Sequence, residues 1–269
     1  MTLNVEETTW EPSDVVGVPK VQPWKYVVVY GRVVTFGLLQ IAAVYGLYLA
    51  VTCAYWKTLI FNNIILLMAA IGISAGNHRL WSHRAYKAKW PLQIILMIFT
   101  SMTYQFSIIN WVRDHRLHHK YTDTDADPYN ASRGLFFSHI GWLLVRKHPD
   151  VKKYGKNIDM IDIYGNPVLR FQKKYAVPIV GSACFLLPTF IPVYFWNENP
   201  SVAWHVCLLR YVISLNQTFL VNSFSHTFGF KPYDRGIKST NNSYFFFLLL
   251  VKVSTIIIMY FLVIIDQLN

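Results

Sequence analysis

Three histidines lie within five positions of the segment WVRDHRLHHKYTDTDADPYN, residues 111–130. They are His115, His118 and His119, at spacings i, i+3 and i+4. On a helix, residues three and four apart share a face, so we expect all three imidazoles to point to one side. Clustered imidazole nitrogens are suitable ligands for iron, zinc or copper. The segment therefore predicts a metal site, on a helix that closes before Pro128.

A second histidine pair lies upstream, where His78 and His83 flank the sequence RLWS. Five residues of α-helix turn through about 500°, which separates two side chains by about 140°. The pair can face one ion only if the helix breaks, or if the ion lies between the helix end and the next segment. By itself the pair could be interfacial histidines beside Trp81. Together with the first cluster and the distant His226, it favours a metal centre.

The composition is that of a membrane protein. Of 269 residues, 54% are hydrophobic and only 14% are charged, a balance that argues against a soluble enzyme. The net charge of +11 is assigned to basic loops facing a cytoplasmic leaflet rather than to nucleic-acid binding. Cys53, Cys184 and Cys207 lie in or beside hydrophobic runs, which predicts small core residues and no disulfide framework.

Four hydrophobic runs have about the ~20 residues needed to cross a bilayer. They cover residues 33–53, 58–77, 175–196 and 202–224. The connections within the first and second pairs are short, so we expect two helical hairpins. Between the hairpins, residues 78–174 hold 16 of the 25 Lys and Arg residues, which predicts a cytosolic cap that contains both histidine pairs. The fold class predicted is an all-α membrane protein with four transmembrane helices.

Three other segments complete this topology. Residues 1–24 predict a loosely ordered cytosolic N-terminus without a cleavable signal peptide. Residues 89–107 are too short and too close to the histidines for an obvious span, and predict an interfacial or re-entrant helix. In the C-terminal stretch 238–269, residues 245–265 are hydrophobic except for Lys252 and a few hydroxyls. This stretch is either a fifth spanning helix or an aggregation-prone segment.

Four motifs occur in the order GNHRLWSHRAYKA, WVRDHRLHHKYTDTDADPYN, RGLFFSHIGWLLVRKHP and LVNSFSHTFGFKPYD. With them the chain, over about residues 27–237, resembles the membrane fatty acyl-CoA desaturases of the insect and animal stearoyl-CoA type. The resemblance implies a multi-pass protein of the endoplasmic reticulum membrane with its histidines facing the cytosol. It implies a centre of two Fe²⁺ ions, O2 as oxidant, cytochrome b5 as electron donor, and a cis double bond introduced into a long-chain acyl-CoA, with Δ9 as the expected position.

The resemblance also assigns residues to roles. The implied metal ligands are His78, His83, His115, His118, His119 and His226, with Asn222 acting through a water. Gln105, Trp111 and Thr218 are expected at the bend of a substrate tunnel, and Arg113, Asp114, Arg146 and Lys147 at the acyl-CoA headgroup. Phe106 departs from the family, which often has an asparagine there. We expect His139, His148 and His205 to be structural or, at most, to support the site.

The family has a third histidine box after the position of His226, whereas this sequence has no later histidine. The ligand set is therefore expected to be incomplete. We expect the purified polypeptide to hold fewer than two irons and not to desaturate stearoyl-CoA. One explanation for residues 238–269 is translated intron or frameshifted sequence. Two alternatives stay open: an inactive acyl-CoA-binding variant that associates with itself or with a complete desaturase, and a related membrane di-iron hydroxylase.

Overall fold

The computed structural model describes residues 25–227. The predicted N-terminal lead, residues 1–24, and the hydrophobic tail, residues 238–269, lie outside the described residues. Within the described range the chain is helical and has no β-strand, only one isolated bridge between Val28 and Val145. This confirms the predicted all-α class.

The first hairpin consists of α1 (Tyr30–Thr52) and α2 (Trp56–Ile71). Helix α2 continues without interruption into a π-helix, η2 (Gly72–Ser82). Hydrophobic side chains of α1 are widely exposed, including Ile41 at 67% and Val44 at 70%, as expected for a helix that faces lipid.

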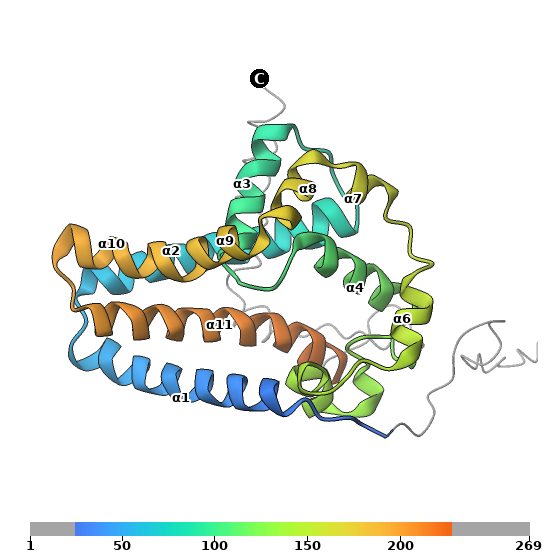
Figure 1. Ribbon diagram of the computed structural model, residues 1–269, viewed down its shortest axis with the longest axis horizontal. Coiled ribbons are helices and arrows are strands. Elements are labelled where there is room, and N and C mark those ends of the chain that lie inside the picture. The colour runs from blue at the N-terminus through green and yellow to red at the C-terminus, as the bar shows by residue number, and fades with distance from the viewer. Residues whose placement is uncertain (1–24, 228–269) are drawn as a thin grey trace, which may run out of the picture.

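The second hairpin begins with three consecutive helical segments, α9 (Ala176–Gly181), η5 (Ser182–Leu186) and α10 (Leu187–Trp196). It ends with α11 (Pro200–Thr227), which packs against α1, α2 and α10 (Figure 1). Three of the described helices are long and hydrophobic enough to cross a membrane: 30–52, 56–82 and 176–196. Helix α11 has 28 residues but is more polar, so its crossing stays a prediction.

A buried carboxylate joins the two hairpins at the end of the bundle that is distant from the two histidine clusters. Glu198, between α10 and α11, is 3% exposed. Its Oε2 accepts hydrogen bonds from Tyr55 N at 2.9 Å and Thr58 Oγ1 at 2.5 Å. Trp196 Nε1 also donates to Thr58 Oγ1, at 2.8 Å. The start of α2 is therefore capped by a side chain from the other hairpin.

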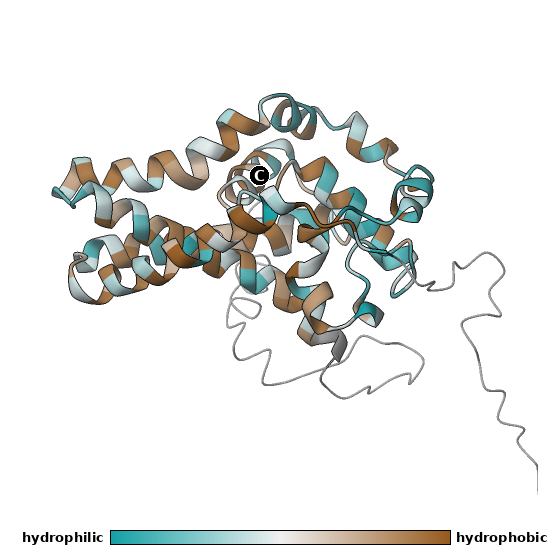
Figure 2. Cartoon of the chain, turned by 60° about the horizontal axis from the view of Figure 1, so that its bottom comes forward, coloured by the Kyte–Doolittle hydropathy of each residue, from teal (hydrophilic) through white to brown (hydrophobic). Residues whose placement is uncertain are grey.

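The cap contains α3 (Trp90–Ser101), α4 (Ile108–Lys120) and a series of short helices. The short helices are η3 (Ala131–Arg133), η4 (Phe137–Gly141), α5 (Trp142–Leu144), α6 (Pro149–Gly155), α7 (Ile161–Gly165) and α8 (Pro167–Lys174). Figure 2 shows hydrophobic residues along the long helices and more hydrophilic ones in the cap. With 12 residues, α3 is too short to cross a bilayer.

Helix α4 has a well-defined beginning. Ser107 accepts a hydrogen bond from Asn110 N, and Gln172 Oε1 of α8 accepts one from Ile108 N at 3.2 Å. The Gln172 side chain is fully buried. Two of the amide groups left without intrahelical partners at a helix start are satisfied in this way. The contacts fix where the histidines of α4 lie relative to the rest of the cap.

Candidate metal centre and adjoining cavity

Four histidines from two helices converge at one point. One ring nitrogen from each lies within 4.8 Å of all the others, in the group His78, His83, His115 and His119. We call this group the histidine quartet. The Nε2–Nε2 distances are 3.1 Å for His83–His78, 3.3 Å for His115–His83 and 3.0 Å for His119–His115. Two nitrogens bound to one ion at about 2.1 Å, at angles between tetrahedral and octahedral, lie roughly 3.0–3.4 Å apart. The quartet therefore fits one transition-metal ion.

The π-helix explains how His78 and His83 face the same point. His83 N donates to His78 O at 3.0 Å, a bond to the fifth residue back, so a turn here contains more residues than the 3.6 of an α-helix. The Ser82 hydroxyl repeats this spacing by donating to Asn77 O at 2.6 Å. The 140° separation expected from α-helical geometry does not apply, because η2 is π-helical and ends at Ser82, with His83 as its C-cap residue. The pair meets the histidines of α4 at this helix end, which is one of the two arrangements expected from the sequence.

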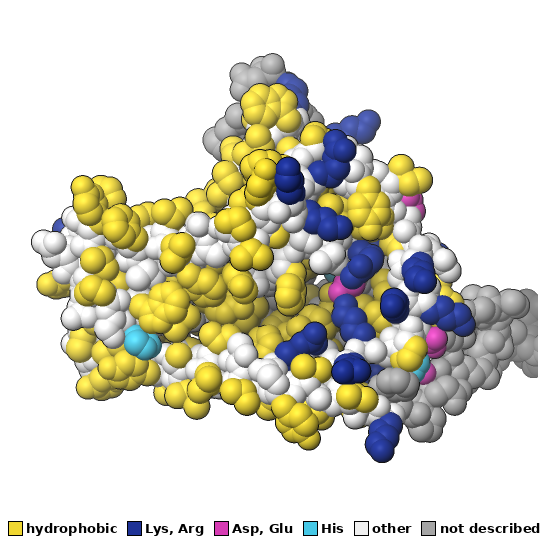
Figure 3. All heavy atoms as spheres, in the orientation of Figure 1, with side chains coloured by type: hydrophobic (Ala, Val, Ile, Leu, Met, Phe, Trp, Pro, Cys, Tyr) yellow, Lys and Arg dark blue, Asp and Glu magenta, His cyan; other side chains and the backbone are white. Residues whose placement is uncertain are grey.

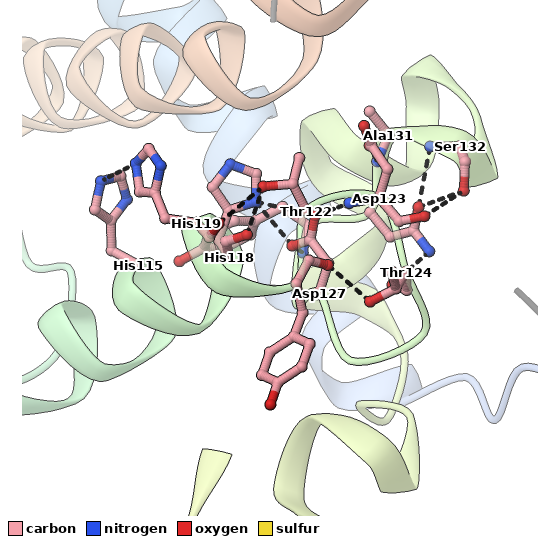
Figure 4. A network of polar contacts seen from close by, with 12 residues as sticks. His115, His118, His119, Thr122, Asp123, Thr124, Asp127, Ala131 and Ser132 are labelled. Carbon is pink, nitrogen blue, oxygen red and sulfur yellow. Dashed lines mark hydrogen bonds and ion pairs between the residues drawn. The ribbon is translucent and has the colours of Figure 1, made fainter. Parts of the chain in front are cut away.

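The three histidines of α4 do not all join the quartet. His115 and His119, four residues apart, do. The His118 ring is buried, and its Nδ1 lies 2.9 and 3.0 Å from the two carboxylate oxygens of Asp127 (Figure 4). The ring centroids of His118 and His119 are 5.4 Å apart. The expectation that all three imidazoles share one direction is thus met by two of them, and His118 lies beside the quartet.

Three aspartates that follow α4, Asp123, Asp125 and Asp127, form the loop that supports His118. Asp127 accepts hydrogen bonds from Asp123 N and Tyr129 N, both at 2.9 Å. Asp125, almost fully buried, pairs with Arg133 at 2.6 Å. A carboxylate on Nδ1 fixes the tautomer and orientation of a histidine, an arrangement typical of histidines that bind metals through Nε2.

The electrostatic surroundings keep two histidines of the quartet, His83 and His115, in their ligand form. Burial, followed by the neighbouring histidines, holds the pKa of His115 well below its usual value. Burial and the Arg116 guanidinium lower the pKa of His83. Neutral imidazole is the form that binds metals, so both rings are prepared for an ion at neutral pH.

A cavity of about 600 Å³ adjoins the quartet. His115, Asn222 and the three predicted tunnel residues are among its lining residues. Trp111 Nε1 donates to Gln105 Oε1 at 3.2 Å, and Gln105 Nε2 donates to Thr218 Oγ1 at 2.9 Å. The three predicted tunnel residues therefore form one hydrogen-bonded chain on the wall of the cavity. His226 lies in the last turn of α11, but its side chain is outside the described part of the chain.

Unusual backbone geometry brings Gln105 to this position. The residues on either side, Tyr104 and Phe106, have positive φ angles of 48° and 65°. Non-glycine residues adopt this region rarely and at a cost, and such residues often occur at functional sites. Phe106 also lines the cavity and is 72% exposed, so the residue that departs from the family pattern lies at the opening.

The cavity changes character along its length. Its inner wall is hydrophobic and includes Phe36, Leu39, Phe185, Tyr211 and Leu215. Its outer end carries Arg113, Asp114 and Lys147. In Figure 3, hydrophobic side chains surround a hollow between the helices, and Lys and Arg side chains gather on the cap beside it. This shape and polarity suit a long apolar chain with an anionic head.

The charged outer end is shared with a second cavity. Asp114 pairs with Arg113 at 3.0 Å and with Lys147. These three residues also line a neighbouring cavity of about 580 Å³, to which Lys152 and Lys156 contribute. Arg146, the fourth residue expected at the headgroup, lines neither cavity, and its amide donates to Val27 O at 2.9 Å.

Comparison with known proteins resolves the class to which this site belongs. The family model for fatty acid desaturase matches residues 54–252. The chain belongs to the fatty acid desaturase family. The matched segment includes the histidine quartet and most of the cavity lining, and it makes the protein an oxidoreductase of the desaturase class.

Individual desaturases agree with the family assignment. The acyl-CoA Delta(11) desaturase of Choristoneura rosaceana is 60% identical over 224 residues, which cover 83% of this chain and 67% of that protein. The acyl-CoA Delta(11) desaturase of Spodoptera littoralis is 56% identical over 90% of this chain and 71% of its own length. The acyl-CoA Delta-9 desaturase of Acheta domesticus is 52% identical over 82% of this chain and 62% of its own length. These names do not favour the hydroxylase or the inactive variant.

Proposed function

We propose that this desaturase acts on long-chain acyl-CoA and removes one hydrogen from each of two neighbouring CH2 groups to form a cis double bond. O2 is the oxidant and is reduced to two waters by these two hydrogens together with two electrons from cytochrome b5 and two protons. The observation that carries the proposal is the course of the 600 Å³ cavity. It leads from a basic outer end, past His115 of the quartet, to a hydrophobic inner wall. A thioester-linked chain placed in it brings its middle methylenes close to the metal centre.

The donor set of the quartet fits iron, because neutral imidazoles bind Fe²⁺ without adding the charge of carboxylates. The quartet would hold one ion, and His118, Asn222 and His226 are proposed as ligands or water-holding residues of a second. Iron, when bound, supplies the O2 activation and hydrogen abstraction that protein side chains cannot perform.

The protein residues select which methylenes react. The hydrogen-bonded chain from Trp111 through Gln105 to Thr218 forms part of the cavity wall next to His115, and a bound acyl chain is proposed to bend around it. The hydrophobic inner wall excludes water and favours an alkyl tail at about 0.8 kcal/mol per buried CH2. The bend and the depth of the wall together set the distance from the thioester to the reacting carbons.

The headgroup is proposed to lie across the shared residues of the two cavities. Arg113 and Lys147 would contact its phosphates, and the second cavity, with Lys152 and Lys156, would take the nucleotide end. Arginine and lysine suit phosphate binding. The cytosolic surface of the cap, which holds 16 of the 25 Lys and Arg residues, is the proposed docking site for cytochrome b5 at the endoplasmic reticulum membrane.

Lipid analysis in a yeast strain without its own desaturase tests the activity. We would express the chain beside a chimera whose residues after 227 come from the Choristoneura rosaceana relative. The chimera is expected to restore unsaturated lipids, and mass spectrometry then distinguishes Δ9 from Δ11 products. Yeast that expresses the native chain tests the expectation that this chain does not desaturate stearoyl-CoA, in which case its lipids stay saturated. An accumulated, iron-loaded chimera that leaves all lipids saturated would refute the proposed reaction.

A matched pair of variants tests the headgroup site separately. Lys147 lines both cavities and Arg146 lines neither. We expect Lys147→Gln to weaken stearoyl-CoA binding by about tenfold, the usual size of one charge-assisted phosphate contact. Arg146→Gln is expected to change binding less than twofold. Equal effects of the two variants in equilibrium binding would show that the headgroup lies elsewhere.

A further inference from the structure

Arg116 connects the two helices that carry the quartet. It follows His115 on α4, yet its guanidinium reaches the end of η2. Arg116 NH2 donates to Trp81 O at 2.6 Å, and Arg116 Nε donates to Ser82 O at 3.3 Å. These are the last residues of the π-helix, next to His83. A single side chain next to His115 on α4 therefore contacts the backbone beside His83.

The two carbonyls contacted by Arg116 lie where a helix leaves such groups without intrahelical partners. A cation at this end of a helix also interacts favourably with the helix dipole. A π-helical turn is less common than an α-helical turn and is usually a short local feature. The end of η2 is thus held by an external donor in addition to its local backbone bonds, His83 N to His78 O at 3.0 Å and Ala85 N to Arg79 O at 2.9 Å.

Asp162 of α7 holds Arg116 in this orientation. Its two carboxylate oxygens accept from Arg116 NH1 at 2.9 Å and Arg116 NH2 at 2.8 Å. Arg116 NH1 also donates to Asp159 O at 2.6 Å, and the Arg116 side chain is only 11% exposed. A bidentate carboxylate fixes the guanidinium plane, which lysine cannot reproduce.

We propose that Arg116 is a positioning residue, which holds η2 in π-helical register against α4 so that the four imidazoles stand at ligand spacing before an ion binds. The inference rests on the proposed metal-binding function of the quartet. Arg116 itself does not bind the ion. A shift of the hydrogen-bond register by one residue would rotate His83 by about 100° around the helix and remove it from the quartet.

Co²⁺ titration of the full-length apo-protein in detergent tests this role, because its visible absorption reports the coordination geometry. Arg116→Gln is expected to weaken Co²⁺ binding by about 10- to 100-fold, the range found when groups that orient metal ligands are removed. It should also change the Co²⁺ spectrum. Arg116→Lys should lie between the wild type and Arg116→Gln, since it keeps the charge but not the planar fork.

Arg84→Gln is the matched control. Arg84 also pairs with Asp162, at 2.9 Å, and with Asp159, at 3.1 Å, but the hydrogen bonds of its guanidinium go to these carboxylates and not to the backbone of η2. It should leave the Co²⁺ affinity and spectrum within twofold of wild type. Adding millimolar ethylguanidinium to Arg116→Ala should restore the wild-type spectrum in part, which a general loss of stability would not allow.

These measurements distinguish the positioning role of Arg116 from the metal-binding function of the quartet. A folded Arg116→Gln protein with wild-type Co²⁺ affinity and spectrum overturns the positioning role. Should Arg116→Gln fail to fold, Asp162→Asn, which keeps the size of the side chain, is measured in its place, and unchanged binding again overturns the inference. If the wild type binds Co²⁺ no better than His83→Ala, the metal-binding function itself is refuted, and the inference with it.

Discussion

Helices α4 and η2 each present two histidines to the same point, but they do so with different windings. On α4, His115 and His119 are four residues apart, as α-helical geometry requires. On η2, His78 and His83 are five apart and are aligned by a π-helical turn. The difference shows that a shared face is set by the hydrogen-bond pattern of the helix and not by residue spacing alone.

The two helices also differ in how they are supported. Helix α4 begins with its own cap, Ser107, supplemented by the Gln172 side chain of α8, and continues with regular α-helical bonds to its end. The π-helix begins at Gly72, which lies so close to α3 that a Cβ there would be 2.3 Å from Thr100 N. Its last two carbonyls accept hydrogen bonds from Arg116 of α4. The less common winding is thus held at both ends by other helices.

The largest effect is expected when His83 exchanges places with the neighbouring Ser82, because this changes the histidine spacing that the π-helix requires. In the double variant Ser82→His/His83→Ser, the histidine spacing becomes four residues, which would suit an α-helix but not η2. We expect Co²⁺ affinity to fall by more than about a hundredfold, since even changes outside the ligand set cost about 10- to 100-fold. Titration of the apo-protein measures this.

Ser82→Ala is the control for the exchange, because it removes only the hydroxyl that donates to Asn77 O. It should keep the affinity within a few-fold of wild type. The corresponding double variant on α4, His119→Lys/Lys120→His, should also bind Co²⁺ more weakly, because it places the second histidine five residues after His115 on an α-helix. Retained binding after Ser82→His/His83→Ser would mean that η2 is α-helical in solution.

A smaller effect is expected from the glycine at the start of the π-helix. Gly72→Ala places a methyl group against the backbone of Phe99 and Thr100, and overpacking of this kind costs about 1–3 kcal/mol. Gly37→Ala in α1, where nothing lies within 4 Å of the new Cβ, should be neutral or slightly stabilising. The thermal unfolding midpoints of the two variants give the comparison. Equal midpoints would show that α3 does not hold the start of η2.

Sequence alone predicted those features that depend on residue type and composition. The membrane class, the two histidine clusters and the residues around Gln105 could be inferred from motifs. The π-helix could not, because nothing in GISAGNHRLWS favours i+5 over i+4 bonding locally, although a histidine pair five apart was itself a signal. The roles of Arg116, Gln172 and Glu198 depend on segments between 34 and 143 residues distant. Such contacts are set by tertiary packing, which a single sequence does not reveal.

The smallest expected effect is on the pH dependence of stability, which compares His115 of α4 with His83 at the end of η2. The fold lowers the pKa of His115 far more than that of His83. As the pH falls below about 6.5, the unfolded chain takes up a proton at each histidine before the folded chain does. Stability of the apo-protein is therefore complete above that pH and is lost as the pH falls toward the lowered folded values. For one proton, the slope is at most about 1.4 kcal/mol per pH unit.

His115→Gln removes this titration from α4, and His83→Gln removes it from the end of η2. Unfolding midpoints between pH 5 and 8, with a chelator present, should depend on pH less in His115→Gln than in His83→Gln. The reason is that burial and four neighbouring histidines hold the pKa of His115 well below its usual value, whereas burial and Arg116 lower the pKa of His83. A flatter profile for His83→Gln would reverse the comparison and mean that the π-helical pair is the more deeply desolvated one.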